Sequence, residues 1–285
     1  MPEARVIEVA RAKINLALHI LGRRADGYHA LDSIVAFADI GDRLTLERSP
    51  HSQCEIRYLG PFGEALAALQ GNIILSAEHE LRSTLAVAFP KSSFALEKNL
   101  PIAAGIGGGS ADAAAALRGL VKLHGLECSS TTLSSVARKI GADVPVCLLS
   151  RTCRMRGTGE ILEEVHGLGE HHAVLVNPGI ELSTSAVFAR LGLERQSSAY
   201  APIELPLMLG KCRNDLTDAA IALAPQIKSV LSMLERQAGA TLVRMSGSGP
   251  TCFGLFDASE SAAEAAARIA ADRPAWWCRA TRIGN

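Results

Sequence analysis

The sequence predicts an α+β fold in two lobes, and three observations support this class. Strand-like alternation fills the first 60 residues, a glycine-rich segment near residue 105 leads into a helix, and helices alternate with strands beyond residue 155. The 285 residues are 48% hydrophobic, which is enough to bury a substantial core. We therefore expect an N-terminal lobe over residues 1–155, a C-terminal lobe over residues 156–285 and a site in the cleft between them.

Extended segments open the chain. Strands are predicted over Arg5–Ala10 and Ala12–Leu21, because each run favours extended structure. In the second run, apolar residues alternate with the others, so Lys13 and Asn15 share the face opposite the apolar side chains. Further strands are predicted over Leu31–Ala38, Arg43–Glu47 and Cys54–Tyr58.

Helices enter after residue 70. Asn72 is a good N-cap for a helix with one apolar stripe, and a strand over Ser93–Leu96 follows it. A glycine-rich segment then runs directly into a helix over Ala111–His124. The lobe is predicted to end with a helix over Thr131–Ile140 and an apolar strand over Val146–Leu149.

The C-terminal lobe mixes helices and strands, with start signals at Ser183, Asn214 and Pro225. The predicted helices span Ser183–Leu191, Leu216–Ala224, Gln226–Gln237 and Ser259–Ala271. The predicted strands span Ala173–Val176, Thr241–Met245, Cys252–Phe256 and Trp276–Arg282.

The glycine-rich segment is the main candidate for a binding site. Glycines before a helix let backbone N–H groups approach an anion, and the positive end of the helix dipole favours negative charge. Phosphate is therefore the natural ligand, although such a segment also serves as a plain connector. It is not a Walker A motif, because no Gly-Lys-Ser/Thr follows, and Ser110 stands where a dinucleotide fingerprint needs its third glycine.

Two residues suit phosphoryl transfer, which needs a base for the attacking hydroxyl and positive charge for the phosphates. Asp143 lies in a loop next to apolar residues, where partial burial would tune it as a base. Lys13 would supply the charge. Each also has a simpler explanation, because Asp before Val-Pro is often a turn residue and an outward Lys on a strand is usually solvated.

Tyr28 and His29 stand out because aromatic residues are only 4% of the chain, yet this pair lies in a polar loop. A flat ring there would stack on a base, and an imidazole both donates and accepts hydrogen bonds, as the edge of a nucleobase requires. Alternatively, the two side chains pack back on their own loop. His171 and His172 lack further ligands at metal-binding spacing, so we expect a solvated loop there.

Charge and cysteine content limit location and partners. Lys and Arg number 29, and so do Asp and Glu, so no uniform field attracts nucleic acid or an anionic membrane. No apolar run reaches the length of a membrane span, and the first residues do not form a secretion signal. The seven cysteines contain no C-x-x-C pair. We expect reduced thiols, a cytoplasmic location and a small-molecule substrate, while the oligomeric state is not predictable.

The quoted motifs resemble a known family. Pro101–Ala111 resembles the second motif, and Met245–Phe253 the third, of the galactokinase, homoserine kinase, mevalonate kinase and phosphomevalonate kinase superfamily. Four more segments are similar to the branch that phosphorylates a cytidine-diphosphate-linked methylerythritol in the non-mevalonate isoprenoid pathway. These segments are Ala12–Leu16, Arg24–His29, Gly141–Pro145 and Asn214–Leu216.

The resemblance implies the roles of individual residues. Lys13 and Asp143 would be the catalytic pair, with Asp143 accepting the proton of the substrate's 2-hydroxyl. Asn15 would bind the methylerythritol portion, His29 the cytosine edge, Tyr28 and Phe188 the cytosine ring, and Thr184 would lie close by. The ATP phosphates, with Mg²⁺ on unassigned ligands, would be bound by Pro101, Ile102, Ala103, Ala104, Gly105, Ile106, Gly107, Gly108, Gly109, Ser110 and Ala111.

The resemblance also implies the fold: an N-terminal domain like ribosomal protein S5 domain 2 and a C-terminal ferredoxin-like domain. Two sequence departures affect ATP contacts. Ala111 replaces a second serine and so removes one hydroxyl, while Pro250 in the third motif lacks an N–H. Two other functions stay open: another kinase of the superfamily, of homoserine or mevalonate type, and a noncatalytic nucleotide-binding module.

Overall fold

The computed structural model describes residues 5–49, 54–69, 71–165, 167–194, 197–199, 201–204 and 207–284. The chain divides into two compact units. Unit 1 comprises Met1–Ala12, Ile40–Ile102 and Gly107–Ser150, and unit 2 comprises Lys13–Asp39, Ala103–Ile106 and Arg151–Asn285. The units interleave along the sequence because two long strands, β1 (Arg5–Arg23) and β2 (His29–Arg48), contribute residues to both. The boundary at residue 155 between two lobes stays a prediction.

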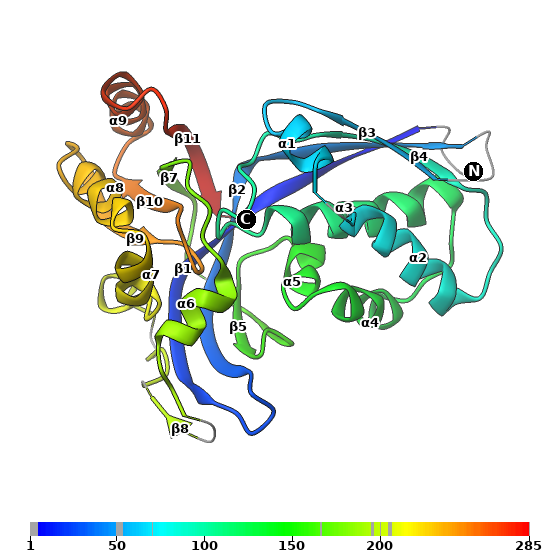
Figure 1. Cartoon of the computed structure of the whole chain (residues 1–285), viewed down its shortest axis with the longest axis horizontal. Helices are drawn as coiled ribbons and strands as arrows, with labels where there is room; N and C mark the ends of the chain where they lie inside the picture. Colours follow the sequence, from blue (N-terminus) through cyan, green and yellow to red (C-terminus); the bar gives the residue numbers. More distant parts are fainter. Residues whose placement is uncertain are drawn as a thin grey trace. The chain divides into compact units, whose positions relative to one another are not determined.

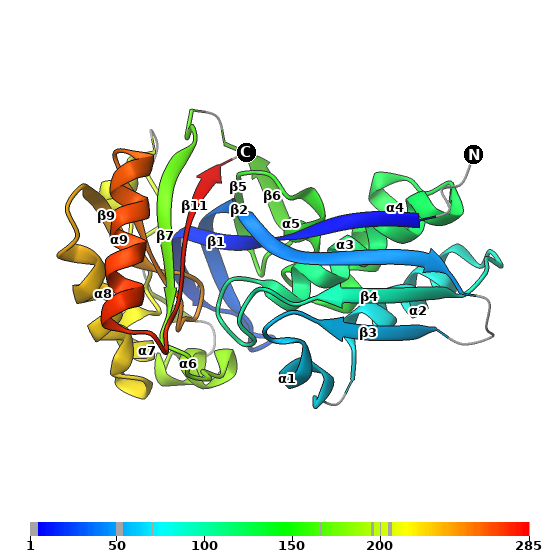
Figure 2. The same ribbon diagram turned by 90° about the horizontal axis from the view of Figure 1, so that it is seen from above.

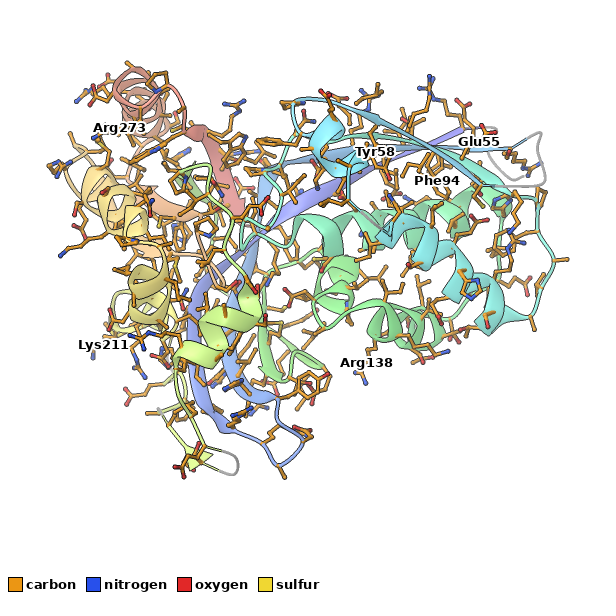
Figure 3. All side chains as sticks on the ribbon, viewed as in Figure 1. Glu55, Tyr58, Phe94, Arg138, Lys211 and Arg273 are labelled. Carbon is orange, nitrogen blue, oxygen red and sulfur yellow. The ribbon has the colours of Figure 1, made fainter. Side chains whose placement is uncertain are left out.

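The sheet of unit 1 is formed by the first residues of β1, the last residues of β2, β4 (Ser92–Glu97) and β3 (Glu55–Leu59). β2 pairs with β1, and antiparallel with β4, which in turn pairs in parallel with β3. Tyr58 and Phe94, labelled in Figure 3, come from the neighbouring strands β3 and β4. Figure 1 shows the larger helices of unit 1 on one side of these strands.

Unit 1 contains helices α1 (Gly63–Ala67), α2 (Ile73–Leu85), α3 (Gly108–His124), α4 (Ser130–Ile140) and α5 (Val144–Leu149). The short α1 follows β3, and the other helices lie on one side of the sheet (Figure 1). As predicted, Asn72 caps α2, because its side chain accepts hydrogen bonds from the N–H groups of Ile74 and Leu75. The core contains the fully buried Leu44, Leu46 and Leu96 from the sheet and Leu117 from α3.

Three expectations for this half of the chain were wrong. The predicted strand over Val146–Leu149 is helix α5, because Pro145 favours the first turn of a helix and a short apolar run does not distinguish helix from strand. Helix α3 begins three residues earlier than predicted, so its first turn is Gly108, Gly109 and Ser110. The four short strands predicted over residues 5–21 and 31–47 are the two continuous strands β1 and β2.

Unit 2 contains four neighbouring antiparallel strands in the order β11-β7-β10-β9, and β11 also pairs with β2. The strands are β7 (His171–Asn177), β9 (Ala240–Met245), β10 (Cys252–Phe256) and β11 (Trp277–Gly284). Helices α8 (Gln226–Glu235) and α9 (Ser259–Asp272) pack against these strands (Figure 2). This is the strand order of a ferredoxin-like domain, as the resemblance implied.

Unit 2 has further elements outside these four strands. It contains β5 (Cys153–Gly157), β6 (Ile161–Glu164), α6 (Thr184–Arg190), β8 (Ser197–Ser198), the 3₁₀ helix η1 (Leu209–Lys211) and α7 (Thr217–Leu223). Strand β5 pairs with both β2 and β6. The predicted α+β class is confirmed. In the part of the chain that the structure describes, no helix has the length and apolarity needed to cross a bilayer.

Candidate active site

Lys13 and Asn15 lie in the part of β1 that belongs to unit 2, and both are almost completely buried. The Lys13 ammonium donates a hydrogen bond of 3.1 Å to Oδ1 of Asn15. Asn15 in turn donates from Nδ2 to Oγ of Ser33 at 2.8 Å, and Ser33 donates to the carbonyl of Ala17. The alternative of a solvated Lys13 is therefore wrong, because a buried ammonium is retained where polar groups hold it.

Residues of the second and third motifs contact each other within unit 2. Ser246 accepts a hydrogen bond from the N–H of Asn15 at 3.1 Å, and its hydroxyl donates to the carbonyl of Gly105 at 3.2 Å. A Cβ on Gly105 would lie 2.5 Å from the Gly249 carbonyl oxygen, and one on Gly247 would lie 2.5 Å from the Gly105 carbonyl oxygen. Only glycine permits this close approach of two backbones. The third motif therefore fixes the conformation of the second around Gly105.

The second motif enters unit 1 again at the start of α3. Gly107, the N-cap, has a left-handed φ of 67°, and Gly108 and Gly109 form the first turn. The first N–H groups of a helix have no partner within it, and they carry the positive end of the dipole. A Cβ on Gly109 would meet no atom within 4 Å, so space is open beside this turn. These features are those of an anion-binding helix start.

Asp143 is the residue that precedes α5, so it stands at the start of a helix and not in the predicted loop before a strand. Its backbone carbonyl accepts from the N–H of Cys147, which fixes the turn, and its side chain is half-buried. Asp143 belongs to unit 1 and Lys13 to unit 2. Their action as a pair stays a prediction.

The predicted base-binding residues fall in unit 2. The rings of His29 and Phe188 have centroids 4.8 Å apart and planes inclined by 34°. Burial and, second, the charge of Arg23 lower the pKa of His29. Its Nε2 is buried and has no hydrogen-bond partner among the described residues. Tyr28 is 67% exposed and is held through its backbone N–H, which donates to Asp26.

Thr184 begins α6, and its hydroxyl lies 2.8 Å from that of Ser248 in the third motif. The structure thus brings Thr184 to the glycine cluster over Gly247–Gly249. Ser248 itself is buried, with 6% of its surface exposed.

Sequence reasoning missed the residues whose hydrogen bonds hold the predicted site residues in place. Ser33 and Ser246 position Asn15, and Asn214 donates from Nδ2 to the carbonyls of Met245 and Gly247, both at 2.8 Å. Asn214 was predicted as a helix cap and quoted within a family motif, but without a role in the site, and its Oδ1 does accept from the N–H of Leu216 just before α7. Alternation on β2 would have placed Ser33 on a buried face, but nothing in the sequence identified its partner.

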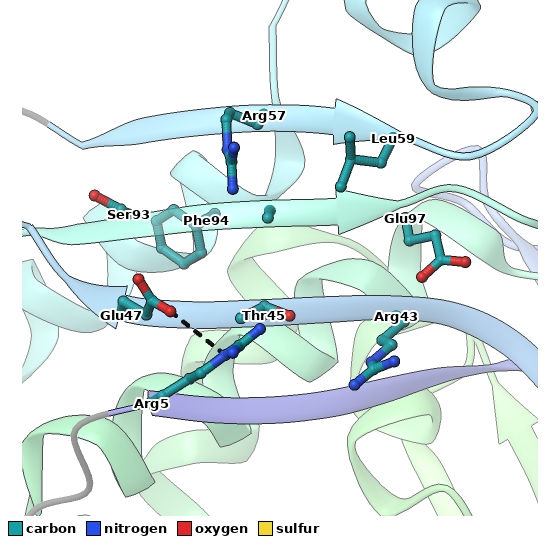
Figure 4. Close-up of a pocket in the computed structure, with 10 residues that line it drawn as sticks. Arg5, Arg43, Thr45, Glu47, Arg57, Leu59, Ser93, Phe94 and Glu97 are labelled. Carbon is teal, nitrogen blue, oxygen red and sulfur yellow. Dashed lines mark ion pairs between the residues drawn. The ribbon is translucent and has the colours of Figure 1, made fainter.

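A separate hollow of about 260 Å³ lies on the sheet of unit 1 (Figure 4). Arg5, Arg43, Arg57, Glu47 and Glu97 give it mixed charge, and Arg5 is paired with Glu47. None of the predicted site residues lines it. Over the described parts of the chain, no three His, Cys, Asp or Glu side chains gather as a metal centre requires.

Comparison with known proteins agrees with the fold. Residues 72–151 match the family described as GHMP kinases N terminal domain, and residues 204–274 match GHMP kinases C terminal. A 4-diphosphocytidyl-2-C-methyl-D-erythritol kinase from Rhizobium etli is 46% identical, over 99% of this chain and 98% of its own length.

Solved structures give the same picture. A crystal structure of 4-(cytidine 5'-diphospho)-2C-methyl-D-erythritol kinase matches with a TM-score of 0.81 and 31% identity, covering 98% of this chain and 100% of that one. A homoserine kinase from Cytophaga hutchinsonii matches with a TM-score of 0.73 but 17% identity, covering 99% and 95%, and so shows the fold alone. The chain belongs to the GHMP kinases and, within them, to the 4-diphosphocytidyl-2-C-methyl-D-erythritol kinase family.

Proposed function

We propose that this chain transfers the γ-phosphoryl group of ATP to the 2-hydroxyl of 4-diphosphocytidyl-2-C-methyl-D-erythritol, in non-mevalonate isoprenoid precursor biosynthesis. The products are the 2-phosphate and ADP. The observation that carries the proposal is 46% identity, over 99% of the chain, with a protein of that name. The buried Lys13 and Asn15 and the paired rings of His29 and Phe188 support it.

The chemistry is assigned to Asp143 and Lys13. Asp143 takes the proton of the 2-hydroxyl as the oxygen attacks the γ-phosphorus, and the bond from that phosphorus to the bridging oxygen breaks to release ADP. Lys13 supplies positive charge near the reacting oxygen. Its hydrogen bond to Asn15 fixes the ammonium, and preorganised charge of this kind stabilises a transition state.

ATP is assigned to the second motif, residues 101–111. The N–H groups in the first turn of α3 would bind phosphate oxygens, and the open space beside Gly109 supports this placement. We expect Mg²⁺ to bind together with ATP and to neutralise charge on the β- and γ-phosphates. In such sites Mg²⁺ usually binds one or two carboxylates in addition to phosphates and water, and no particular carboxylate of this chain is assigned to it.

The cytidylyl substrate is assigned to the residues of unit 2. The lowered pKa of His29 favours its neutral ring, which both donates and accepts, as a cytosine edge requires. Tyr28 and Phe188 would stack on the cytosine ring. Asn15 would bind the methylerythritol portion, with Thr184 close by. A cytoplasmic location without a nucleic-acid partner completes the proposal and rests on the sequence alone.

The proposal is tested by ADP release with MgATP and, in turn, the cytidylyl compound, homoserine, mevalonate and phosphomevalonate, with products identified by mass spectrometry. We expect turnover with the cytidylyl compound alone. Turnover with another acceptor would replace the substrate, and a lack of turnover with all of them would contradict a kinase function.

The base is tested by Asp143→Asn, for which we expect kcat to fall about 10²–10⁴-fold while ATP still binds. Asp218→Asn is the matched control, because Asp218 is an exposed residue in the first turn of α7. Unchanged turnover of Asp143→Asn would mean that Asp143 is structural.

The phosphate site is tested by Gly109→Ala. The added methyl group meets no protein atom and helical alanine is favourable, so stability should not fall. A phosphate held against this turn would be displaced, and we expect KM for ATP to rise roughly tenfold. Gly210→Ala, whose Cβ also meets no atom within 4 Å, is the control. An unchanged KM for ATP would place the phosphates elsewhere.

A further inference from the structure

A buried cluster of three ionisable side chains lies under the start of α3. Lys98, Asp42 and Asp112 are each exposed by no more than 2%. The Lys98 ammonium donates to Oδ2 of Asp42 at 2.5 Å and to Oδ2 of Asp112 at 2.7 Å. All three residues belong to unit 1, and none has a role in the proposed reaction.

The cluster holds both ends of the second motif. Before the motif, Oδ1 of Asp42 accepts from the backbone N–H groups of Asn99 and Leu100, at 2.6 Å and 2.8 Å, and so fixes the chain that enters Pro101. After the motif, Asp112 lies one residue beyond Ala111, in the first turns of α3. Lys98 connects the two acidic side chains.

The ammonium also lies directly beside the helix start. A Cβ on Gly108 would come within 3.2 Å of Nζ of Lys98. A cation at a helix N-terminus opposes the dipole, and a buried ammonium loses its hydration, so Lys98 needs acceptors here, and Asp42 and Asp112 provide them. A cluster of this kind is a poor way to gain stability alone, which points to a role in geometry.

We propose that Lys98, held between Asp42 and Asp112, is the positioning residue of the phosphate loop, fixing the entry and exit of residues 101–111 relative to each other. This inference rests on the proposed role of that segment in binding ATP. A loop whose ends are fixed presents its N–H groups already in place, so ATP binding does not have to order them.

The test uses Asp112→Ala in the full chain. This change frees the exit of the loop and leaves Lys98 paired with Asp42, so no unpaired buried charge remains. We expect KM for ATP to rise about tenfold, with KM for the cytidylyl substrate within about twofold of its original value. We also expect faster amide hydrogen exchange over residues 101–111 without ATP. Asp112→Asn, which keeps an oxygen for Lys98, should restore most of both properties.

The matched control is Glu8→Gln, because Glu8, in β1, makes a similar buried ion pair with the other end of α3. Glu8 is also buried and pairs with Arg118 and Lys122 of α3, at 2.8 Å and 2.5 Å. Glu8→Gln should lower the free energy of unfolding without changing KM for ATP or the rate of amide hydrogen exchange over residues 101–111. The positioning role would be overturned if Glu8→Gln and Asp112→Ala changed KM for ATP equally. It would also be overturned if amide hydrogen exchange over residues 101–111 were unchanged in Asp112→Ala. If the original protein does not turn over ATP, the proposed function fails, and exchange in the absence of ATP still decides the role of the cluster.

Discussion

At the scale of single residues, Tyr28 gives the cleanest test of substrate recognition. It is 67% exposed and makes no ring contact among the described residues, so its side chain contributes little to stability. We expect Tyr28→Ala to raise KM for the cytidylyl substrate about tenfold, because an aromatic stack on a base is worth about 1–3 kcal/mol. KM for ATP and the urea midpoint should not change. Tyr28→Phe keeps the ring and should behave like the original protein; an unchanged KM in Tyr28→Ala would remove the stacking role.

Sequence predicted the residues of this site unevenly, and the reason is physical. Strand alternation placed Lys13 and Asn15 on one face, because a strand repeats every two residues. Ser246, 231 residues after Asn15, reaches its N–H only through the tertiary fold. A local sequence pattern therefore identifies site residues that lie on the same strand or helix. Their hydrogen-bond partners from distant elements depend on how the strands pair, which no local pattern encodes.

At the scale of elements, α3 packs unusually close to the sheet. A Cβ on Gly119 would lie 2.5 Å from Cδ1 and 2.8 Å from Cδ2 of Leu46, which is fully buried. Alanine favours a helix by about 1 kcal/mol over glycine, but overpacking a core costs about 1–3 kcal/mol. We expect Gly119→Ala to lower the free energy of unfolding by about 1 kcal/mol, measured by urea denaturation. Gly210→Ala, in open space, is the control, and a gain in stability for Gly119→Ala would show that Leu46 moves aside at little cost.

Elements with start and stop signals were predictable. Asn72 and Ser183 cap α2 and α6 as expected, and strand β10 has the predicted bounds Cys252–Phe256. Helix α5 was not predicted, because six residues are too few to show a helical period. The pairing of β1 with the distant β8 also has no local signal, because β8 is only Ser197–Ser198.

At the scale of the whole molecule, the class of fold was predictable from the sequence, whereas the division of the chain into two units was not. The α+β class followed from the order of helices and strands, but the interleaving of the two units did not, because it depends on β1 and β2 being continuous across the positions where short strands were expected to end. The predicted strands left gaps between Ala10 and Ala12 and between Ala38 and Arg43. Neither gap is a break, because both stretches lie inside the continuous strands β1 and β2.

The buried charge cluster also shapes how the stability of the whole protein responds to pH. Burial, reinforced by the charge of Asp42 and opposed by Lys98, raises the pKa of Asp112 to about 8. The folded protein thus binds a proton at Asp112 that the unfolded chain, with a pKa near 3.8, has released. Stability from this group is present at low pH and is lost as pH rises toward 8, because folding then requires proton uptake.

Asp112→Asn removes this dependence. We expect the urea midpoint of the original protein minus that of Asp112→Asn to decrease steadily as the pH is raised from 5 to 8.5. His29, His124 and the cysteine thiols titrate in both proteins, so the difference isolates Asp112. Asp32→Asn is the control of opposite sign: burial would raise the pKa of Asp32, but hydrogen bonds from Arg154 and from the N–H of Ile203 lower it overall. The stability that Asp32 contributes is lost only in acid, so the difference in urea midpoint between the original protein and Asp32→Asn should stay constant from pH 5 to pH 8.5. A constant difference for Asp112→Asn would instead mean that Asp112 is ionised over the whole range.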